Sequence, residues 1–471
     1  MQARQTMTTT HPDDLQQPIQ HHRQLRDFLL TGARTRRQWG VGAEMEKLVV
    51  DAETGEAACF TRIEALLEQL AVSGSWQPVY EQGRLTALRG EKSSITLEPG
   101  GQLELSGALC PDLMCCRRDF CAYVDAALEA ARPLGLLFLG LGVQPFSPLR
   151  EIDWLPKSRY GIMRRYMERV GDRGHNMMKQ SAGLQVNLDF ADEVDCMEKL
   201  RVAQWLAPLF YALFANSPLL NGRPSGFLST RGEIWSRTDR DRTGLIPALL
   251  DSRATLDSYV EYALDVPMYF IQRQERYLDM TGERFSFRRF LAEGFAGHVA
   301  CLADWSLHLS TLFPEVRLRP HIELRSADSL PPGLSLSVAA LAKGVLYDAA
   351  ARKEIERLFG SLDTAAFMDI YRQSWRLGLK TPVGRHRLQA LALDVLALAR
   401  EGLERHGRER DQGQDEVRFL DGLDEIAQSG ITLAERLLAR WHGTRAQRFA
   451  ALREHCAFGP CTPCSRTSYN D

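Results

Sequence analysis

The sequence predicts an α+β fold built around an antiparallel β-sheet. Segments with the two-residue alternation of strands are scattered among segments with helical spacing, without the regular strand–helix–strand cadence of a parallel sheet. From residue 330 onward the pattern is almost entirely helical. Phosphate-binding loops of the GxxxxGK[ST] and GxGxxG kinds are absent, so the doubly wound nucleotide-binding folds are not indicated.

The elements follow one another along the chain in mixed order. Helical spacing predicts helices over 20–32, 60–71 and 111–132, whereas alternation predicts strands over 42–51 and 183–190. The apolar run LGLLFLGLGV at 134–143 is shorter than the ~20 residues that a membrane helix needs. We therefore expect it to be a buried strand.

Composition makes small molecules the expected partners. The chain has 471 residues, 44% of them hydrophobic and 25% charged, with a net charge of −2. This near-neutral balance removes the electrostatic case for nucleic acid or an anionic membrane. Ten cysteines without a secretory signal are typical of reduced thiols, so we expect a cytoplasmic protein, either a monomer or a homodimer.

No low-complexity linker divides the chain, and we expect a single domain over 21–445. Residues 1–20 are predicted to be a disordered N-terminal tail, and residues 446–471 an unstructured C-terminal tail. That C-terminal segment contains Cys456, Cys461 and Cys464 in the motif CAFGPCTPC. A zinc site there remains an alternative, but zinc sites usually have four ligands and no fourth is evident nearby.

Charged and amide side chains recur on single faces of four strand-like segments. Successive strand residues point to opposite faces, so residues two apart project together. Glu44 and Glu46 share a face in GAEMEKLVV, and Glu98, Gln102 and Glu104 share one in ITLEPGGQLELSGA, a strand interrupted by Pro-Gly-Gly. A polar strand face is usually a solvated surface, but carboxylates replace the usual Thr, Ser and Lys here.

The other two segments carry amides, arginines and a further carboxylate. In GLQVNLDF, Gln185, Asn187 and Asp189 lie opposite the apolar residues. EVRLRPHIELRSAD is predicted to be one strand, with one face formed by Arg317, Arg319, His321, Glu323 and Arg325. Four such faces favour one shared concave site over four solvated strands.

A divalent cation follows from the convergence of these glutamates. Two carboxylates ~4 Å apart repel by about 4 kcal/mol at an effective dielectric near 20, so a cluster needs neutralising charge. Ligands that are all oxygen favour Mg²⁺ or Mn²⁺, and carboxylate-bound Mg²⁺ commonly completes its shell with water and nucleotide phosphates. The neighbouring arginines would then contact phosphate or substrate carboxylates.

Two further segments carry basic and aromatic residues outside the strands. Residues 225–244 are predicted to form a loop with Arg231, Trp235 and Arg242, and WLPKSRYGIMRRYM contributes Lys157 and Arg159. Such residues suit recognition of a small anionic substrate, although ordinary solvated surface explains them equally well.

These segments together resemble the glutamate–cysteine ligases of the plant and proteobacterial type. The resemblance runs from about residue 25 to 442 and rests on long stretches, among them GAEMEK, SSITLEPGGQLELSGA, WLPKSRYGIMRRYM, GLQVNLDF, GRPSGFLSTRGEIWSRTDRDRTG, YALDVPMYF and TLFPEVRLRPHIELRSAD. It implies a glutamine-synthetase-like fold, in which a curved antiparallel sheet surrounded by helices forms an active-site funnel. It also implies that 21–445 is one catalytic domain.

The implied reaction is ATP-dependent joining of the glutamate γ-carboxylate to the amine of cysteine through a γ-glutamyl phosphate. This is the first step of glutathione biosynthesis, with Mg²⁺, or Mn²⁺ in its place, as cofactor. The alternative is the same mechanism with a different amine acceptor. Carried over onto this chain, the resemblance implies metal-facing Glu44, Glu46, Glu98, Glu104 and Glu323, a phosphoryl-contacting Arg325, and substrate-facing Arg159, Gln185, Asn187, Arg231, Trp235 and Arg242.

Two positions depart from the family pattern. Relatives usually carry His between the two glutamates of GAEMEK, where this chain has Met45, but that residue points to the opposite strand face. The stretch RSADSLPPG also stands where relatives tend to be rich in glycine. The cysteines of this chain do not match those that form redox disulfides in plant relatives, so that control is not carried over.

Overall fold

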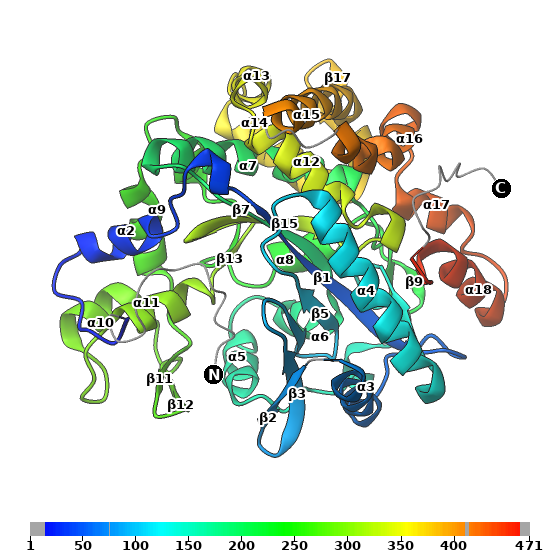
Figure 1. Ribbon diagram of the computed structural model, residues 1–471, viewed down its shortest axis with the longest axis horizontal. Coiled ribbons are helices and arrows are strands. Elements are labelled where there is room, and N and C mark those ends of the chain that lie inside the picture. Colours follow the sequence, from blue (N-terminus) through cyan, green and yellow to red (C-terminus); the bar gives the residue numbers. More distant parts are fainter. Residues whose placement is uncertain (1–14, 75, 410–413, 462–471) are drawn as a thin grey trace.

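A nine-stranded antiparallel sheet organises the molecule, as the sequence predicts (Figure 1). The computed structural model describes residues 15–74, 76–409 and 414–461. The strand order is β14-β15-β7-β1-β5-β4-β3-β2, with β6 paired to the far end of β1. The strands of this sheet are β1 Val41–Asp51, β2 Gln77–Glu81, β3 Arg84–Arg89, β4 Ser94–Leu97, β5 Leu103–Ser106, β6 Leu136–Leu139, β7 Gly183–Leu188, β14 Val316–Arg319 and β15 His321–Asp328. Four two-stranded sheets pair β8 Leu219–Leu220 with β9 Arg223–Pro224, β10 Thr243–Gly244 with β13 Phe313–Pro314, β11 Phe270–Arg273 with β12 Arg276–Asp279, and β16 Pro382–Val383 with β17 His386–Arg387.

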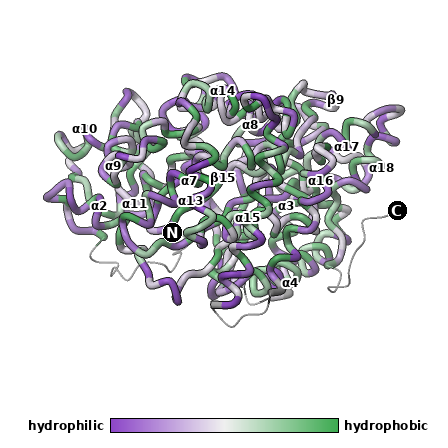
Figure 2. Tube along the Cα trace, turned by 90° about the horizontal axis from the view of Figure 1, so that it is seen from above, coloured by the Kyte–Doolittle hydropathy of each residue, from purple (hydrophilic) through white to green (hydrophobic). Residues whose placement is uncertain are grey.

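Helices surround this sheet. Both views place α2 and α9 to α11 at one end of the molecule and α16 to α18 at the opposite end (Figures 1 and 2). Between them, α7 packs on β15 and α14, and α12 packs on β7 and α15. The helices are α2 Arg23–Leu30, α3 Phe60–Ser73, α4 Leu113–Ala131, α5 Ser158–Met167, α6 Gly174–Gln180, α7 Glu193–Leu213, α8 Thr230–Ser236, α9 Leu256–Asp265, α10 Phe287–Glu293, α11 Leu302–Leu309, α12 Ser337–Leu346, α13 Ala349–Phe359, α14 Thr364–Leu377, α15 Leu388–Glu409, α16 Asp421–Ser429, α17 Leu433–Ala439 and α18 Arg445–Cys456.

Strand β1 is the centre of the sheet because it pairs with three other strands. Its first half lies between β5 and β7, and its second half pairs with β6. Met45 and Val49 are buried in the main hydrophobic core. Residues two apart share a face, so Glu44 and Glu46 project from the side of β1 opposite Met45.

The prediction of a single strand over 315–328 is wrong. The segment forms two antiparallel strands, β14 and β15, which reverse at Pro320. Proline has no N–H to donate to a ladder, so a reversal is favoured at this position. Arg317 pairs directly with Glu323 across the hairpin, and the two side chains therefore still share a face as expected.

The C-terminal segment is folded as far as residue 461, in contrast to the unstructured tail expected over 446–471, of which 462–471 lie outside the described residues. Helix α18 buries Phe449 and Leu452, and the Phe449 ring lies edge-on to Phe146 at 6.2 Å. Phe458 then donates its backbone N–H to the carbonyl of Phe138 at 2.9 Å. The prediction missed this helix because a short helix gains most of its stability from tertiary packing.

The cysteines of CAFGPCTPC do not gather into one site in the described part of the chain. Cys456 is buried and donates to the carbonyl of Leu452, whereas the Cys461 thiol lies beside that of Cys121 on α4. Cys464 lies outside the described residues. The zinc alternative for this motif therefore has no support from Cys456 and Cys461.

At the N-terminus, residues 1–14 of the predicted tail lie outside the described residues. The remainder is held against the domain, because Ile19 donates its backbone N–H to the carbonyl of Ala300 at 2.9 Å.

Hydrophilic and hydrophobic residues alternate along the helices (Figure 2). Among the described residues, no single helix is long and apolar enough to cross a membrane. One pair of helical segments, Pro332–Leu346 and Ala349–Phe359, reaches that length and apolar composition when the two are taken together, but they are bent by 91° where they meet.

Candidate active site

The register of the central strands gathers the predicted polar residues onto one face of the sheet. Glu46 lies directly opposite Glu104 on β5, and Glu44 lies opposite Gln185 on β7. On the other side of β7, Asn187 is opposite Glu323 on β15. Residues directly opposite in an antiparallel pair project to the same face, so four strands contribute to one polar surface.

Both glutamates of β1 are hydrogen-bonded, and Glu44 is buried whereas Glu46 is half-buried. Asn187 Nδ2 donates to Glu44 at 2.9 Å. Glu46 accepts from the Gly183 N–H at 2.5 Å and from Gln185 Nε2 at 3.1 Å. These partners orient the two carboxylates, and Arg317 near Glu44 and Arg231 near Glu46 offset part of the effect of burial on their pKa values.

Burial and mutual repulsion raise the pKa values of these carboxyl groups. Burial raises the pKa of Glu44 to about 7, with further contributions from Glu323 and Glu104. Burial likewise raises the pKa of Glu46 to about 8, with contributions from Glu98 and Glu104. A cation would reverse these shifts because it favours the ionised form of each carboxyl.

Glu104 belongs to the same group and receives two hydroxyl hydrogen bonds. Thr96 donates at 2.8 Å and Ser106 at 2.9 Å. Burial, followed by the proximity of Glu98, raises the pKa of Glu104. Thr96 was not among the predicted site residues, although it stands two residues before Glu98 and strand alternation would place it on the same face.

Glu98 occupies the turn between β4 and β5, where the Pro-Gly-Gly break of the predicted strand becomes a reversal. Gly101 has a φ of +84°, a left-handed conformation that favours glycine. A Cβ on Gly100 would lie 2.2 Å from the Lys179 carbonyl, so this position also requires glycine. The two glycines therefore allow the turn to lie against α6 while half-buried Glu98 stays beside the other carboxylates.

Gln102 does not join this group, contrary to the prediction from strand alternation. Its side-chain amide donates to the carbonyls of Ser181 at 2.7 Å and Met178 at 3.3 Å. The turn ends the simple alternation before residue 102. The role of Gln102 is thus to fix the turn against the end of α6.

Glu323 differs from the other glutamates because arginines neutralise it. Arg317 donates to both of its carboxylate oxygens, at 2.8 Å and 3.0 Å, and Arg325 forms a second ion pair with it. Burial alone would raise the pKa of Glu323, but Arg317 and Arg325 hold that pKa well below its usual range. This pairing was not predicted, because cations were expected to neutralise all of the glutamates.

Arg325 and Arg231 lie next to each other at the β15 side of the polar face. Arg325 also donates to Gln185, and its guanidinium lies 5.7 Å from the ring centroids of both Trp235 and Phe313. Arg231 donates to the Arg325 carbonyl at 3.0 Å, while its Nε and Nη1 atoms are buried without a protein partner. Two unpartnered N–H groups beside Glu46 form an anion-binding feature.

The loop predicted for 225–244 contains a helix. Ser229 caps α8 by accepting from the Gly232 N–H at 3.2 Å, and this short helix carries both Arg231 and Trp235. Trp235 stacks edge-on with Phe313 at 5.8 Å, and its indole N–H is buried without a partner. A helix holds these side chains more rigidly than a loop would.

Two of the predicted substrate-facing arginines have different environments. Arg159 lies on α5 beside Tyr160, at 5.0 Å from its ring, and close enough to Glu98 to interact with its charge. Arg242 is fully buried, pairs with Asp239 at 2.6 Å and donates to the Pro267 carbonyl at 2.7 Å. These contacts hold the Arg242 guanidinium in the protein interior, and its place in a substrate pocket stays a prediction.

The donor set of the polar face fits a hard divalent cation. Glu44, Glu46, Glu98 and Glu104 offer only oxygen ligands, which Mg²⁺ and Mn²⁺ prefer. Among the described residues, no three of the predicted glutamates bring carboxylate oxygens within 4.8 Å of one another. These glutamates therefore do not form a closed set of three protein ligands in this structure.

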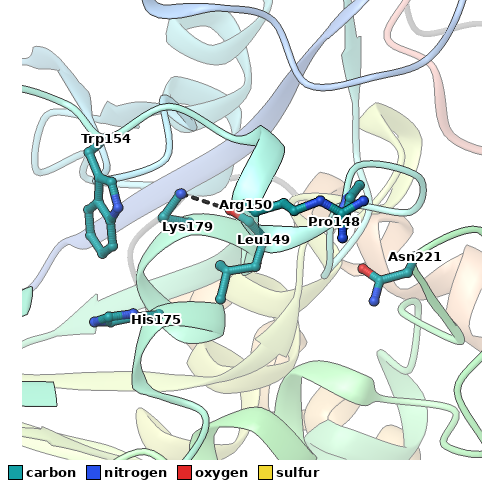
Figure 3. Close-up of a pocket in the computed structure, with 7 residues that line it drawn as sticks. All are labelled: Pro148, Leu149, Arg150, Trp154, His175, Lys179 and Asn221. Carbon is teal, nitrogen blue, oxygen red and sulfur yellow. Dashed lines mark hydrogen bonds between the residues drawn. The ribbon is translucent and has the colours of Figure 1, made fainter. Parts of the chain in front are cut away.

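A separate pocket adjoins the turn that carries Glu98. It has a volume of about 440 Å³, and Lys179, whose backbone contacts Gly100, donates its amine to the Leu149 carbonyl at 2.8 Å within it (Figure 3). Basic side chains of Arg150 and His175 and the ring of Trp154 also line it. None of the residues predicted from the sequence lies in this pocket.

Comparisons with known proteins agree with this architecture. A sequence model of "Glutamate-cysteine ligase family 2" matches residues 40–454. Chloroplastic glutamate–cysteine ligases of Brassica juncea and Arabidopsis thaliana are each 40% identical over 431 residues, which cover 89% of this chain and 81% and 80% of those proteins. Glutamate–cysteine ligase B of Oryza sativa subsp. japonica is 38% identical, over 87% of this chain and 82% of that protein.

The solved structure of a glutamate–cysteine ligase from Francisella tularensis in complex with AMP has the same fold. Its TM-score is 0.55 at 12% identity, and the match covers 88% of each chain. The cytoplasmic location expected from the cysteine content is overturned by the plant relatives, which are named as chloroplastic proteins. Reduced thiols thus do not distinguish the cytoplasm from other reducing compartments. Because the family match and the 40% identity both extend over most of the sequence, the chain belongs to glutamate–cysteine ligase family 2.

Proposed function

We propose that this chain joins the γ-carboxylate of glutamate to the amine of L-cysteine with consumption of ATP, the first step of glutathione biosynthesis. The observation that carries the proposal is the polar sheet face, where glutamates with raised pKa values lie beside Arg231, whose Nε and Nη1 atoms have no protein partner. Such a face offers both cation ligands and anion donors, which transfer of a phosphoryl group requires.

Mg²⁺, or Mn²⁺ in its place, would be held by Glu44, Glu46, Glu98 and Glu104. The raised pKa values of Glu44, Glu46 and Glu104, which arise from burial and from neighbouring carboxylates, support the assignment because a cation favours the ionised form of each group. When bound, the cation neutralises charge on the nucleotide phosphates. Glu323 belongs to a second layer in this proposal, since Arg317 and Arg325 already saturate it.

The chain's own residues would act on the nucleotide and on glutamate. A carboxylate is a poor acyl donor, so ATP converts it to an acyl phosphate, and Arg325 stabilises the charge that develops on the transferring phosphoryl group. Arg231 would bind an anionic oxygen through its two unpartnered N–H groups. Gln185 and Asn187 line the same face and fix the orientation of bound groups.

The amine of cysteine then attacks the acyl phosphate and phosphate leaves. Nothing in this sequence of steps requires a nucleophilic side chain, in agreement with the polar face of glutamates, amides and arginines. Arg159, beside Glu98 on α5, and Trp235 would border the amino-acid site. The AMP bound to the Francisella tularensis enzyme supports an adenine nucleotide as the second ligand.

The alternative is a γ-glutamyl ligase that uses another amine, because no described feature reads the thiol of cysteine directly. An assay of ADP release with glutamate, ATP and Mg²⁺ against a panel of amines decides between them, with products identified by mass. We expect γ-glutamylcysteine as the main product. Turnover with a different amine but none with cysteine would replace the proposal with its alternative.

A matched pair of variants tests the polar face itself. Arg231→Gln removes buried hydrogen-bond donors and should raise the KM for glutamate by at least tenfold. A tenfold change corresponds to about 1.4 kcal/mol of binding free energy. Arg240→Gln removes an exposed guanidinium from the same segment and should leave the KM unchanged. Equal KM values in both variants would exclude Arg231 from the glutamate site.

A further inference from the structure

Outside the polar face, three potential metal ligands converge near the start of α4. One ligand atom each from Cys110, Cys115 and Asp119 lies within 4.8 Å of the others, and this is the one such group among the described residues. The Cys110 thiol donates to Asp119 Oδ2 across 3.6 Å. Because the group combines two thiols with a carboxylate, its chemistry differs from that of the all-oxygen glutamates.

The local fold holds these side chains in place. Cys115 and Asp119 are four residues apart on α4 and therefore lie on one helical face. Asp112 caps the helix by accepting from the Cys115 N–H at 2.7 Å. Cys110 exchanges two backbone hydrogen bonds with Val41, at 2.7 Å and 2.9 Å, which fixes it against the first residue of β1.

The spacing suits a tetrahedral ion. With zinc–sulfur and zinc–oxygen bonds of about 2.3 Å and 2.0 Å, tetrahedral angles separate the sulfur and oxygen ligands by about 3.5 Å. The Cys110–Asp119 distance of 3.6 Å is close to this value without any ion. The Cys116 thiol lies beside that of Cys110 and is the nearest source of a fourth ligand.

We propose that Cys110, Cys115 and Asp119 form a binding site for a thiophilic divalent cation such as Zn²⁺. Cys110 is buried, Cys115 is half-buried and Asp119 is exposed, so the ion enters from solvent along the Asp119 side. Each coordinating thiol gives up its proton to solvent when the ion binds. The bound ion ties the start of α4 to β1, three residues before Glu44.

Cd²⁺ is a suitable probe, since its bonds to thiolates absorb in the ultraviolet and Mg²⁺ produces no such band. The full-length protein, reduced and freed of metal, is titrated with Cd²⁺ in excess Mg²⁺, and Zn²⁺ is then added as a competitor. We expect a thiolate band that saturates near one equivalent and is lost when Zn²⁺ displaces Cd²⁺. Absence of the band, or a disulfide between these cysteines in the reduced protein, would overturn the proposal.

Matched variants assign the ligands. Cys115→Ser should abolish most of the band, and Asp119→Asn should weaken Cd²⁺ binding by at least the ~10–100-fold that loss of even an outer-shell partner costs. Cys121→Ser, which removes another half-buried thiol from α4, should leave both band and affinity unchanged. Asp119 is exposed, so the Asp119→Asn variant remains informative if a cysteine variant misfolds. Unchanged Cd²⁺ affinity in Asp119→Asn, together with a full thiolate band in Cys115→Ser, would contradict the site.

Discussion

Replacement of Glu44 by glutamine tests the charge balance of the polar sheet face without disturbing its shape. The amide keeps an oxygen to accept the hydrogen bond from Asn187, so the main loss is one buried negative charge. Burial, together with Glu323 and Glu104, raises the pKa of Glu44 from 4.5 to about 7 in the folded protein. Stability that depends on this group is therefore greatest when the carboxyl is protonated.

The sign and size of the effect follow from that shift. Because the folded pKa lies above the unfolded value, the contribution is fully present below about pH 4.5 and is lost as the pH rises through about 7. At 1.36 kcal/mol per pKa unit, the full penalty for ionising Glu44 is about 3 kcal/mol. Part of this penalty is already present at pH 5. The difference in the free energy of unfolding between variant and wild type should therefore grow by about 2–3 kcal/mol from pH 5 to pH 9.

Denaturant unfolding of the metal-free protein at both pH values measures this gap. We expect Glu44→Gln to be the more stable protein at pH 9, whereas Glu53→Gln, an exposed position after β1, should show a constant gap at both pH values. Added Mg²⁺ at pH 9 should stabilise the wild type more than Glu44→Gln. A gap that changes by no more than the ±0.5 kcal/mol typical of surface substitutions would refute the electrostatic reasoning.

Two further changes test the turn and the C-terminal helix. Glu98→Gln should raise the Mg²⁺ concentration needed for turnover and slow the reaction by about 10–100-fold. Reaction rates measured over a range of Mg²⁺ concentrations test this, and an unchanged Mg²⁺ dependence would remove Glu98 from the cation site. Phe449→Ala should lower the free energy of unfolding by about 3–5 kcal/mol, because this ring is buried against Phe146. Both this variant and its control, Val194→Ala at a side chain that is 77% exposed, are measured by denaturant unfolding. Equal changes in the free energy of unfolding would show that α18 adds little stability.

The face on which each polar residue lies was predictable because it depends only on local alternation. Glu44 and Glu46, two apart on β1, and Gln185 and Asn187, two apart on β7, share a face in any regular strand. The register that sets Glu46 opposite Glu104 depends on long-range pairing, which one sequence does not specify. The resemblance to glutamate–cysteine ligases supplied that step.

The errors have physical causes in non-local contacts. Arg242 belongs to a segment rich in charges, which indicates a solvated loop, yet its ion pair with Asp239 allows complete burial. The C-terminal helix had a local signal that was overlooked, since Thr444 and Gln447 form a capping box at its start. Burial of Phe449 against a distant part of the chain then makes that short helix stable.

The polar face divides its carboxylates into two electrostatic classes, and the division explains how one surface can serve both a cation and phosphate. Glu323 remains ionised because Arg317 and Arg325 balance it, and the pair of arginines is thereby held in place to meet an anion. At Glu44 and Glu46, burial and neighbouring carboxylates outweigh the nearby arginines, so the pKa values of both remain raised and a cation would favour their ionised forms. Carboxyl groups whose environments push their pKa values apart in this way are typical of sites that perform chemistry, since a purely structural sheet face gains nothing from buried repulsion.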